Sequence, residues 1–169
     1  MGARNSHCSF CGQAYAPEAP WPRACAACGQ ITYRNPLPVA VTLVPLDSGL
    51  LVVRRGIEPA RGKLALPGGY INYGESWQAA GAREVHEETG LSLDPALIRE
   101  FAVHSAPDGA LLVFGLAAAL RQADLTPFKL DAETLEALVI DQPQELAFSL
   151  HTTVVADYFH GQRGPASAA

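Results

Sequence analysis

The sequence predicts a mixed α/β domain preceded by a small module held together by cysteines. All four cysteines of the 169-residue chain lie within the first 28 residues. After them, short segments rich in β-branched and apolar residues lie on both sides of a helical segment at 76–89, and a second helical pattern follows at 144–159. Strands that flank a central helix, with another helix at the end, are typical of layered helix and sheet.

The four cysteines form two similar motifs, CSFCGQ at 8–13 and CAACGQ at 25–30. Their C-x2-C-x13-C-x2-C spacing suits a tetrahedral site in which four thiolates bind Zn²⁺. Two disulfides are the alternative, but they disagree with the cytoplasmic location that we expect because the first residues lack a signal-peptide pattern. We therefore predict a zinc ribbon over residues 1–36, ended by the prolines of YRNPLP. Its ligands are Cys8, Cys11, Cys25 and Cys28.

Composition and charge argue against several classes of protein. Hydrophobic residues make up 49% of the chain and charged residues 17%, which is typical of globular proteins and not of disordered ones. The longest apolar run, ALLVFGLAAAL, is shorter than the roughly 18 residues of a membrane span, so we expect no membrane partner. The net charge of −5 divides into +2 over residues 1–38 and −7 over 39–169. An acidic body argues against a broad nucleic-acid surface.

The body of the chain, residues 37–160, begins with two strand-like segments. VAVTLVPL at 39–46 and LLVVRR at 50–55 predict a hairpin, joined by the turn residues DSG. Glycine and proline make 59–75 mostly loop around a short strand at 64–66. Further strands are predicted at 97–106, 110–120 and 135–140. Residues 161–169 are expected to form a flexible tail.

The helix at 76–89 has recognisable ends, because Ser76 suits the N-cap and Gly90 suits the C-terminal stop. At about 100° per residue, Glu84, Glu87 and Glu88 share a face with Trp77, the face expected to pack against the sheet. Ala82 falls toward the opposite side.

Three negative charges on a packed helix face are unfavourable unless a positive charge lies nearby. A solvated charge run is the alternative, but the acids share their side with the tryptophan. Like charges one turn apart cost a few tenths of a kcal/mol, and partial burial without a counterion costs several kcal/mol per ion. A divalent cation offsets both costs. Carboxylates without histidine or thiolate suit Mg²⁺ or Mn²⁺.

The glycine-rich loop LPGGY, just before the helix, lets the backbone approach a ligand closely, and a helix N-terminus favours anions. A metal next to a phosphate site indicates attack of water on phosphorus. Arg83 precedes Glu87 by one turn and is expected to hold it in position, with a plain surface ion pair as the alternative.

From Gly69 to Leu91 the sequence reads G-x5-E-x7-R-E-V-x-E-E-x-G-L, and it therefore resembles the Nudix hydrolase signature at every defined position. The resemblance implies an α/β/α Nudix sandwich with a mixed sheet and hydrolysis of a nucleoside diphosphate linked to another moiety. It also implies Mg²⁺ or Mn²⁺ bound by Glu84, Glu87 and Glu88 with the Gly69 carbonyl. In this family Glu75 supports the loop, partly by pairing with the arginine at position 83.

The rest of the chain is similar to two Nudix groups that carry a zinc ribbon. NADH pyrophosphatases have a Ser-Gln-Pro-Trp array, of which DQPQELAF at 141–148 shares only Gln-Pro, and they are usually longer. The segment at 128–148 instead resembles ADP-ribose/FAD pyrophosphatases. We therefore expect cleavage of ADP-ribose or FAD to AMP plus ribose 5-phosphate or FMN. An NADH/NAD pyrophosphatase is the alternative, as is a non-catalytic nucleotide-sensing module whose ribbon contacts a partner.

Residues outside the signature complete the predicted site. Arg55, at a strand end, is a candidate phosphate contact or a plain exposed charge. Tyr70 and Tyr73 are candidates for stacking on a base or sugar, with simple packing as the alternative. Glu133 and Glu136 are candidates for a further metal ligand or for the base that activates water, whereas His104 and His151 are expected to be structural. The resemblance also favours a homodimer.

Overall fold

The computed structural model describes residues 5–121, 123, 128–129 and 131–162. Contacts within the chain separate Met1–Pro36 from Leu37–Ala169. In the first unit, β1 (Arg23–Ala24) pairs antiparallel with β2 (Ile31–Thr32). The guanidinium of Arg23 stacks over Trp21, 4.6 Å from the ring centroid, so an aromatic and cationic contact supports a unit with little regular structure.

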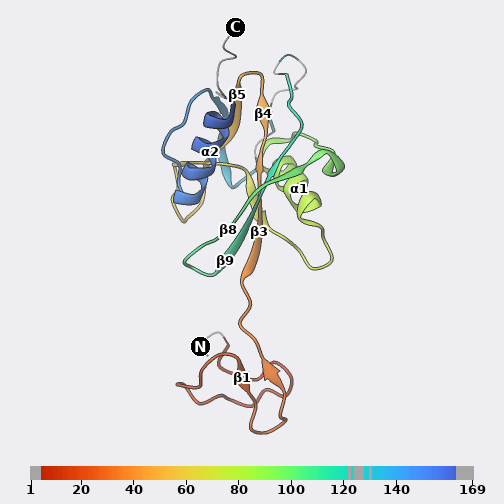
Figure 1. Ribbon diagram of the computed structural model, residues 1–169, viewed down its shortest axis with the longest axis vertical. Coiled ribbons are helices and arrows are strands. Elements are labelled where there is room, and N and C mark those ends of the chain that lie inside the picture. Colours follow the sequence, from red (N-terminus) through yellow and green to blue (C-terminus); the bar gives the residue numbers. More distant parts are fainter. Residues whose placement is uncertain (1–4, 122, 124–127, 130, 163–169) are drawn as a thin grey trace. The chain divides into compact units, whose positions relative to one another are not determined.

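The described part of the second unit contains two four-stranded sheets (Figure 1). The first is mixed and has the order β7-β3-β9-β8, in which β3 and β9 are parallel. The second is antiparallel, with β10-β5-β4 in order and β6 paired to β5. The strand bounds are β3 (Leu37–Leu43), β4 (Pro45–Leu46), β5 (Gly49–Arg55), β6 (Leu64–Ala65), β7 (Gly68–Tyr70), β8 (Arg99–Ser105), β9 (Ala110–Leu116) and β10 (Thr134–Ile140).

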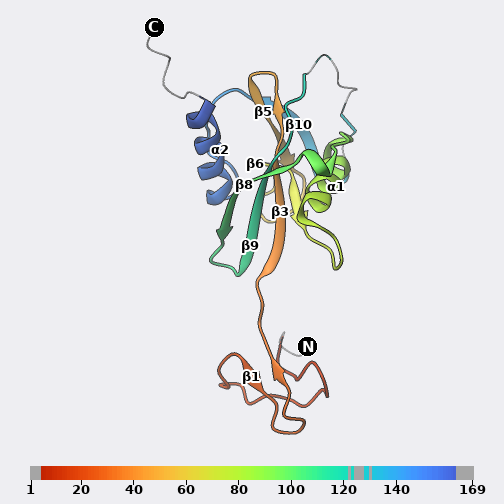
Figure 2. The same cartoon turned by 45° about the vertical axis from the view of Figure 1, so that its right-hand side comes forward.

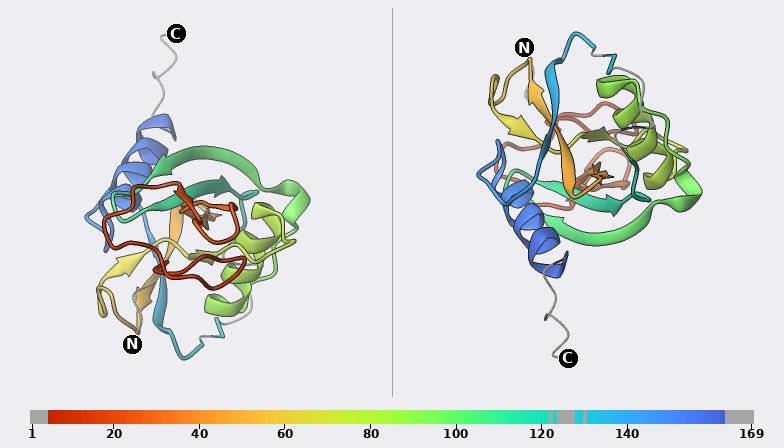
Figure 3. Two further views of the ribbon diagram at one scale, coloured as in Figure 1. Left: turned by 90° about the horizontal axis from the view of Figure 1, so that it is seen from below. Right: turned by 90° about the horizontal axis from the view of Figure 1, so that it is seen from above.

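Within the described residues, two α-helices cover opposite sides of these strands. They are α1 (Trp77–Thr89) and α2 (Ser149–Gln162), and a short 3-10 helix, η1 (Pro95–Leu97), precedes β8. Figure 2 shows α1 and α2 on either side of the strands, and the end-on views of Figure 3 agree. The predicted mixed α/β layer fold is therefore confirmed.

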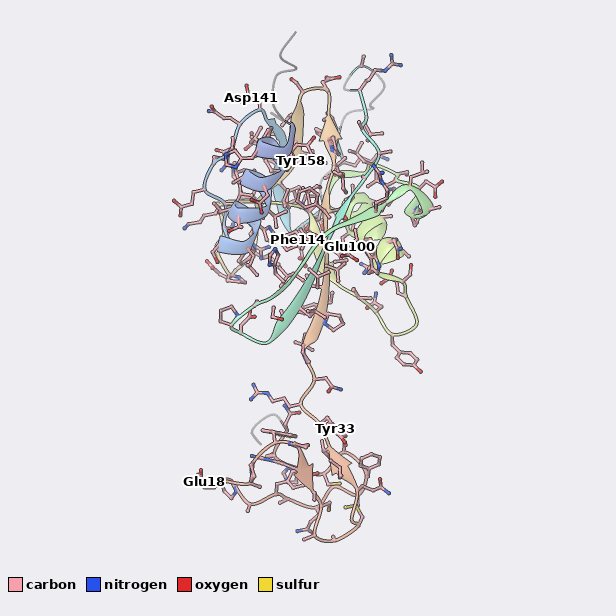
Figure 4. All side chains as sticks on the ribbon, in the orientation of Figure 1. Glu18, Tyr33, Glu100, Phe114, Asp141 and Tyr158 are labelled. Carbon is pink, nitrogen blue, oxygen red and sulfur yellow. The ribbon has the colours of Figure 1, made fainter. Side chains whose placement is uncertain are left out.

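Alternation along β5 explains the two cores. Leu50 and Val52 pack with Val154 and Tyr158 of α2, whereas Leu51, between them, packs in the core with Val85 of α1. Successive side chains of a strand point to opposite faces, so an unbroken apolar run belongs to a strand buried on both sides. Figure 4 shows Phe114 in the strand layer and Tyr158 on α2.

The predicted hairpin between 39–46 and 50–55 is only partly right. β4 pairs with β5, but β3 belongs to the other sheet, where it pairs with β7 and β9. Pro45 lacks an N–H group and cannot extend the backbone ladder of β3, so the chain changes sheets there. The sequence also did not indicate β7, because its residues Gly-Gly-Tyr have little intrinsic strand preference.

The boundaries of both helices follow from local hydrogen bonds. The Ser76 hydroxyl accepts a hydrogen bond from the Ala79 N–H at 3.1 Å, and Gly90 has φ of 78°, so both predicted ends of α1 are confirmed. The prediction that α2 begins at 144 is wrong, because the Ala147 N–H is bonded to the Leu64 carbonyl of β6 at 2.7 Å. α2 ends at Gln162, and residues 163–169 of the predicted tail lie outside the described residues.

Ala82 was predicted to point away from the sheet, but it is buried in the core with Val85. The helix is packed on a second side as well, because Ala82 and Val85 share a buried cluster with Leu51 of β5. Within the described residues, no helix has the length and apolar character needed to cross a bilayer.

Ser76→Ala is expected to lower the free energy of unfolding by about 1 kcal/mol, because the Ala79 N–H loses its acceptor. Ser76→Asp supplies another acceptor and is expected to keep most of the stability. Urea unfolding followed by circular dichroism compares the two variants. Equal losses in both would show that the cap bond does not account for the effect.

Candidate active site

A cavity of about 950 Å³ lies in the second unit, where β3, β7 and α1 approach the end of β5 and the start of α2. We call it the carboxylate groove. The acids in its lining include Glu84, Glu87, Glu88, Asp131 and Glu133. A volume of this size is in the range of pockets that take small organic ligands.

Arg83 is the centre of an ion network beside the groove. Its Nε and Nη2 atoms donate to the two carboxylate oxygens of Glu75 at 3.0 and 3.1 Å. Nη1 donates to Glu84 at 2.6 Å and to Glu87 at 3.1 Å, and Nη2 also donates to the Tyr70 carbonyl at 3.0 Å. The hydrogen bonds from Arg83 lower the pKa of Glu75, and Glu75 in turn raises the pKa of Arg83. The network joins α1 to the glycine-rich loop.

Glu84 lies directly above Gly69. Only 15% of its side chain is exposed, and a Cβ atom at position 69 would overlap its carboxylate. Burial raises the pKa of Glu84, while Arg83 opposes that shift. Gly69 pairs with Ala40 of β3, so the sheet fixes the loop beneath the acid. Only glycine permits this approach of the carboxylate to the backbone.

Glu88 is the acid whose charge is least compensated. Its Oε2 atom is the one buried side-chain oxygen or nitrogen that has no hydrogen-bond partner among the described residues. Burial, followed by the charges of Glu84 and Asp131, raises the pKa of Glu88 to about 8, although a backbone hydrogen bond from Gly68 opposes this. A buried, unpaired carboxylate is costly, and such atoms mark sites for an ion or a catalytic role.

These oxygen donors suit a hard divalent cation in their chemistry. In the structure, however, the acids are not gathered as a ligand set. Among the described residues, the four cysteines are the only group of three or more possible ligands whose ligand atoms all lie within 4.8 Å of one another. Glu84 and Glu87 are turned toward Arg83, and the Glu87 side chain is 50% exposed.

The segment at 131–133 forms part of the groove lining. It is held by two backbone bonds, from the Lys129 N–H to the Thr89 carbonyl at 2.9 Å and from the Gly56 N–H to the Glu133 carbonyl at 2.5 Å. Both Asp131 and Glu133 line the groove. Sequence reasoning missed Asp131, since no spacing in this segment relates it to α1. Glu136 is not among the lining residues and pairs with Arg54 at 2.8 Å.

Some of the residues predicted to contact substrate line the groove, and others are exposed to solvent. Arg55 and Tyr70 line the groove, whereas Tyr73 does not and is fully exposed. Arg55 stacks over Phe148, with its guanidinium carbon 5.1 Å from the ring centroid. His151, expected to be structural, is 5% exposed and lines the groove as well.

In the first unit, the four cysteine sulfurs form a separate cluster. Cys8 Sγ lies 3.7 Å from Cys28 Sγ, and Cys11 Sγ lies 3.6 Å from Cys25 Sγ. These distances are too long for disulfides, whose sulfurs are about 2.05 Å apart. They are close to the edge of about 3.8 Å in a tetrahedron with zinc–sulfur bonds of about 2.3 Å. The geometry therefore fits Zn²⁺.

The two motifs fold alike around this cluster. The Cys8 carbonyl accepts from the Gly12 N–H at 3.0 Å, and the Cys25 carbonyl accepts from the Gly29 N–H at 2.8 Å. Hydrogen bonds from the backbone of Cys28 and then Ala27 lower the pKa of Cys25, despite its burial. Lowering this pKa favours the thiolate form that binds metal.

Comparison with protein families gives a match to the NUDIX domain over residues 36–156. An ADP-ribose pyrophosphatase of Methanocaldococcus jannaschii is 28% identical over 141 residues, which cover 78% of each chain. The NAD-capped RNA hydrolase NudC of Edwardsiella ictaluri is 30% identical over 87 residues, or 51% of this chain. Those residues span only 34% of the NudC chain, about a third of its length.

A solved structure is similar over nearly the whole chain. The crystal structure of a NUDIX hydrolase from Nitrosomonas europaea has a TM-score of 0.76 and 26% identity. The match covers 93% of this chain and 92% of that one, so it extends into residues 1–36.

Glu88→Gln is expected to stabilise the protein at pH 8 in buffer without Mg²⁺ or Mn²⁺. Unfolded Glu88 loses its proton near the ordinary carboxyl pKa, whereas the folded residue keeps it up to a pKa of about 8. The folded state binds more protons between these values, so wild-type stability falls as the pH rises through them. Glutamine does not ionise and avoids this loss.

Urea unfolding at pH 5 and pH 8 measures the difference. The advantage of Glu88→Gln over wild type should grow by roughly 3 kcal/mol between these pH values. Glu87→Gln, at a half-exposed side chain, is the control and should follow wild type. An advantage of Glu88→Gln that does not change with pH would contradict the burial argument.

One zinc ion per chain is expected in the purified protein, measured by elemental analysis. Cys25→Ser removes a buried thiolate and should lower the zinc content to less than half. Ser9→Ala, at an exposed neighbouring position, should leave it unchanged. Less than one zinc per wild-type chain after mild purification would count against the zinc ribbon.

Proposed function

This chain belongs to the NUDIX domain family and is a Nudix-type pyrophosphatase, and from that premise we propose that its substrate is ADP-ribose or FAD, cleaved to release AMP. We further propose Mg²⁺ or Mn²⁺ as the catalytic ion, Zn²⁺ as a structural ion in a ribbon over residues 1–36, and a homodimer as the assembly. The observation that carries the catalytic proposal is the buried Glu88 oxygen, which has no partner among the described residues, in a groove lined by further carboxylates.

Each residue of the signature has a role in this proposal. Glu84, Glu87 and Glu88, with the Gly69 carbonyl, would hold the ion. When bound, the ion neutralises phosphate charge and makes water a better nucleophile. Arg83 orients Glu84 and Glu87 through the hydrogen bonds described above, and Glu75 fixes Arg83 in turn.

Hydrolysis also needs an acceptor for the proton of the attacking water. The carboxylates of Asp131 and Glu133 lie in the wall of the groove, and the Asp131 charge is close enough to raise the pKa of Glu88. We propose that Asp131 or Glu133 takes this proton.

The substrate proposal is supported by the ADP-ribose pyrophosphatase of Methanocaldococcus jannaschii, which is similar over most of both chains. The similarity to NudC, an NAD-capped RNA hydrolase, favours a substrate that contains NAD as the second candidate, although it covers about half of this chain. A non-catalytic nucleotide-binding module is the remaining alternative.

Purified protein tested with Mg²⁺ or Mn²⁺ should show its highest kcat/KM on ADP-ribose or FAD. The comparison includes NADH and nucleoside triphosphates, with products separated by chromatography. A strong preference for NADH over ADP-ribose would overturn the substrate while leaving the reaction class intact. Tight binding without turnover on any of these compounds would favour the binding module.

Glu87→Gln and Glu88→Gln should each lower kcat about 100-fold or more, since a metal ligand contributes several kcal/mol to the transition state. Asp131→Asn, Glu133→Gln and Glu136→Gln identify the proton acceptor. We expect the largest of these three losses at Asp131 or Glu133, because Glu136 lies outside the groove. Full activity of both Glu87→Gln and Glu88→Gln in folded protein would refute the proposed metal site.

A further inference from the structure

His151 places an imidazole in the wall of the carboxylate groove, on the first turn of α2. Phe114 and Phe148 enclose its ring edge-on, at centroid distances of 5.6 and 5.1 Å. The Nδ1 atom accepts a hydrogen bond from the Leu66 N–H at 3.2 Å. Packing and this bond hold the ring in one orientation.

The bond from Leu66 determines which ring nitrogen carries the proton. A backbone amide can only donate, so Nδ1 is unprotonated, and a neutral imidazole then carries its proton on Nε2. Burial, and then the nearby charge of Arg55, lowers the pKa of His151 to about 4, so the ring is neutral at pH 7. The Nε2–H group is therefore a fixed hydrogen-bond donor.

This donor opens to the groove. No residue in the described part of the chain accepts a hydrogen bond from Nε2 of His151. If Nε2 were fully buried, it would therefore be a buried atom without a partner. Among the described residues, however, the one such side-chain nitrogen or oxygen is Glu88 Oε2. Nε2 therefore keeps access to solvent. Because His151 lines the carboxylate groove, that access lies through the groove.

Arg55 supplies a second donor next to His151. Its guanidinium stacks on Phe148, the same ring that packs against the imidazole. Nε donates to the Pro59 carbonyl at 2.8 Å, which leaves the two terminal NH₂ groups without a bond within the described residues. The Arg55 charge lowers the pKa of both His151 and Glu88, so Arg55 is close to the imidazole and to the acids.

We propose that Nε2–H of His151 and the guanidinium of Arg55 together bind a phosphate oxygen of the nucleoside diphosphate. A guanidinium matches the geometry and charge of phosphate, and a neutral N–H adds a directed donor without repelling Arg55. The inference rests on the proposed function, because it assigns contacts for the pyrophosphate in the same groove. His151 then has two roles, since Nδ1 supports Leu66 and Nε2 contacts substrate.

Two substitutions separate these roles. In His151→Asn, the amide oxygen takes the place of Nδ1 and keeps the Leu66 bond, but no donor remains at the Nε2 position. In His151→Gln, the amide nitrogen takes the place of Nε2, and the acceptor for Leu66 is lost. The probe is α,β-methylene-ADP with Mg²⁺, because its P–C–P bridge cannot be hydrolysed.

His151→Asn should weaken probe binding about 10-fold, measured by calorimetry, while its Tm stays near that of wild type. His151→Gln should bind within about 3-fold of wild type but melt at a lower temperature. His104→Asn is the matched control, since His104 also packs on Phe114, at 5.9 Å, but does not line the groove. Binding that is lost in His151→Gln and kept in His151→Asn would make His151 a structural support and overturn the proposal.

Nitrogen-15 NMR of the histidine rings gives a test on the wild-type protein. Saturating probe should shift the Nε2–H resonance of His151, leave its Nδ1 unprotonated, and leave the His104 ring unchanged. An unchanged Nε2–H resonance would overturn the proposal.

The binding measurement also distinguishes this inference from the proposed function. If the protein hydrolyses neither ADP-ribose nor FAD but His151→Asn still weakens probe binding, the substrate proposal fails and the phosphate contact stands. If His151→Asn and wild type hydrolyse ADP-ribose with the same KM, the substrate proposal stands and the phosphate contact fails.

Discussion

The guanidinium of Arg83 is the contact on which the arrangement of the groove depends. Its five hydrogen bonds reach three carboxylates and one backbone carbonyl, from α1, from the residue before the helix cap and from β7. Lysine could not replace it, because an ammonium has three donors and no planar fork. With Arg83 in place, α1 can carry Glu84 and Glu87 beside a half-buried glycine loop without two unpaired charges.

Arg83 does not serve all three signature acids. It pairs with Glu84 and Glu87 but not with Glu88, whose Oε2 atom is buried and has no partner in the part of the chain that the structure describes. The network thus compensates the negative charges of Glu84 and Glu87. At Glu88, which Arg83 does not reach, a bound cation would lower the free energy of the folded protein most. A protein under selection for stability alone would put an apolar residue there, so the cost of Glu88 is an argument for function.

Features set by local spacing were predictable from the sequence. The cysteine motifs, the cap at Ser76, the stop at Gly90 and the acids on α1 all depend on residues within a few turns of one another. Asp131 was not predictable, because backbone bonds to Thr89 and Gly56, distant in sequence, and the pairing of β10 with β5 bring its segment to the groove.

The pairing of β3 and the second role of His151 depend on tertiary contacts in the same way. β3 and β5 are both apolar runs, and although Pro45 marks where the chain changes sheets, only the tertiary structure shows that β3 pairs with β7 and β9. His151 lies in an apolar helix, and its burial between aromatic rings is what a structural histidine would show. The bond from Leu66 to Nδ1 and the place of His151 in the groove lining together indicate that Nε2–H has no acceptor among the described residues.

Four consecutive residues, 66–69, join the two walls of the groove. The Leu66 N–H is bonded to His151, and the Pro67 carbonyl accepts from the Thr42 N–H at 2.9 Å. The backbone of Gly68 lies close enough to Glu88 to lower the pKa of its carboxyl group, and Gly69 lies beneath Glu84. One short segment therefore sets the distance between the acids of α1 and the donors of β5 and α2. Because β3 fixes this segment from below, substitutions at the end of β5 or on α2 can alter what is bound while the acids on α1 keep their positions.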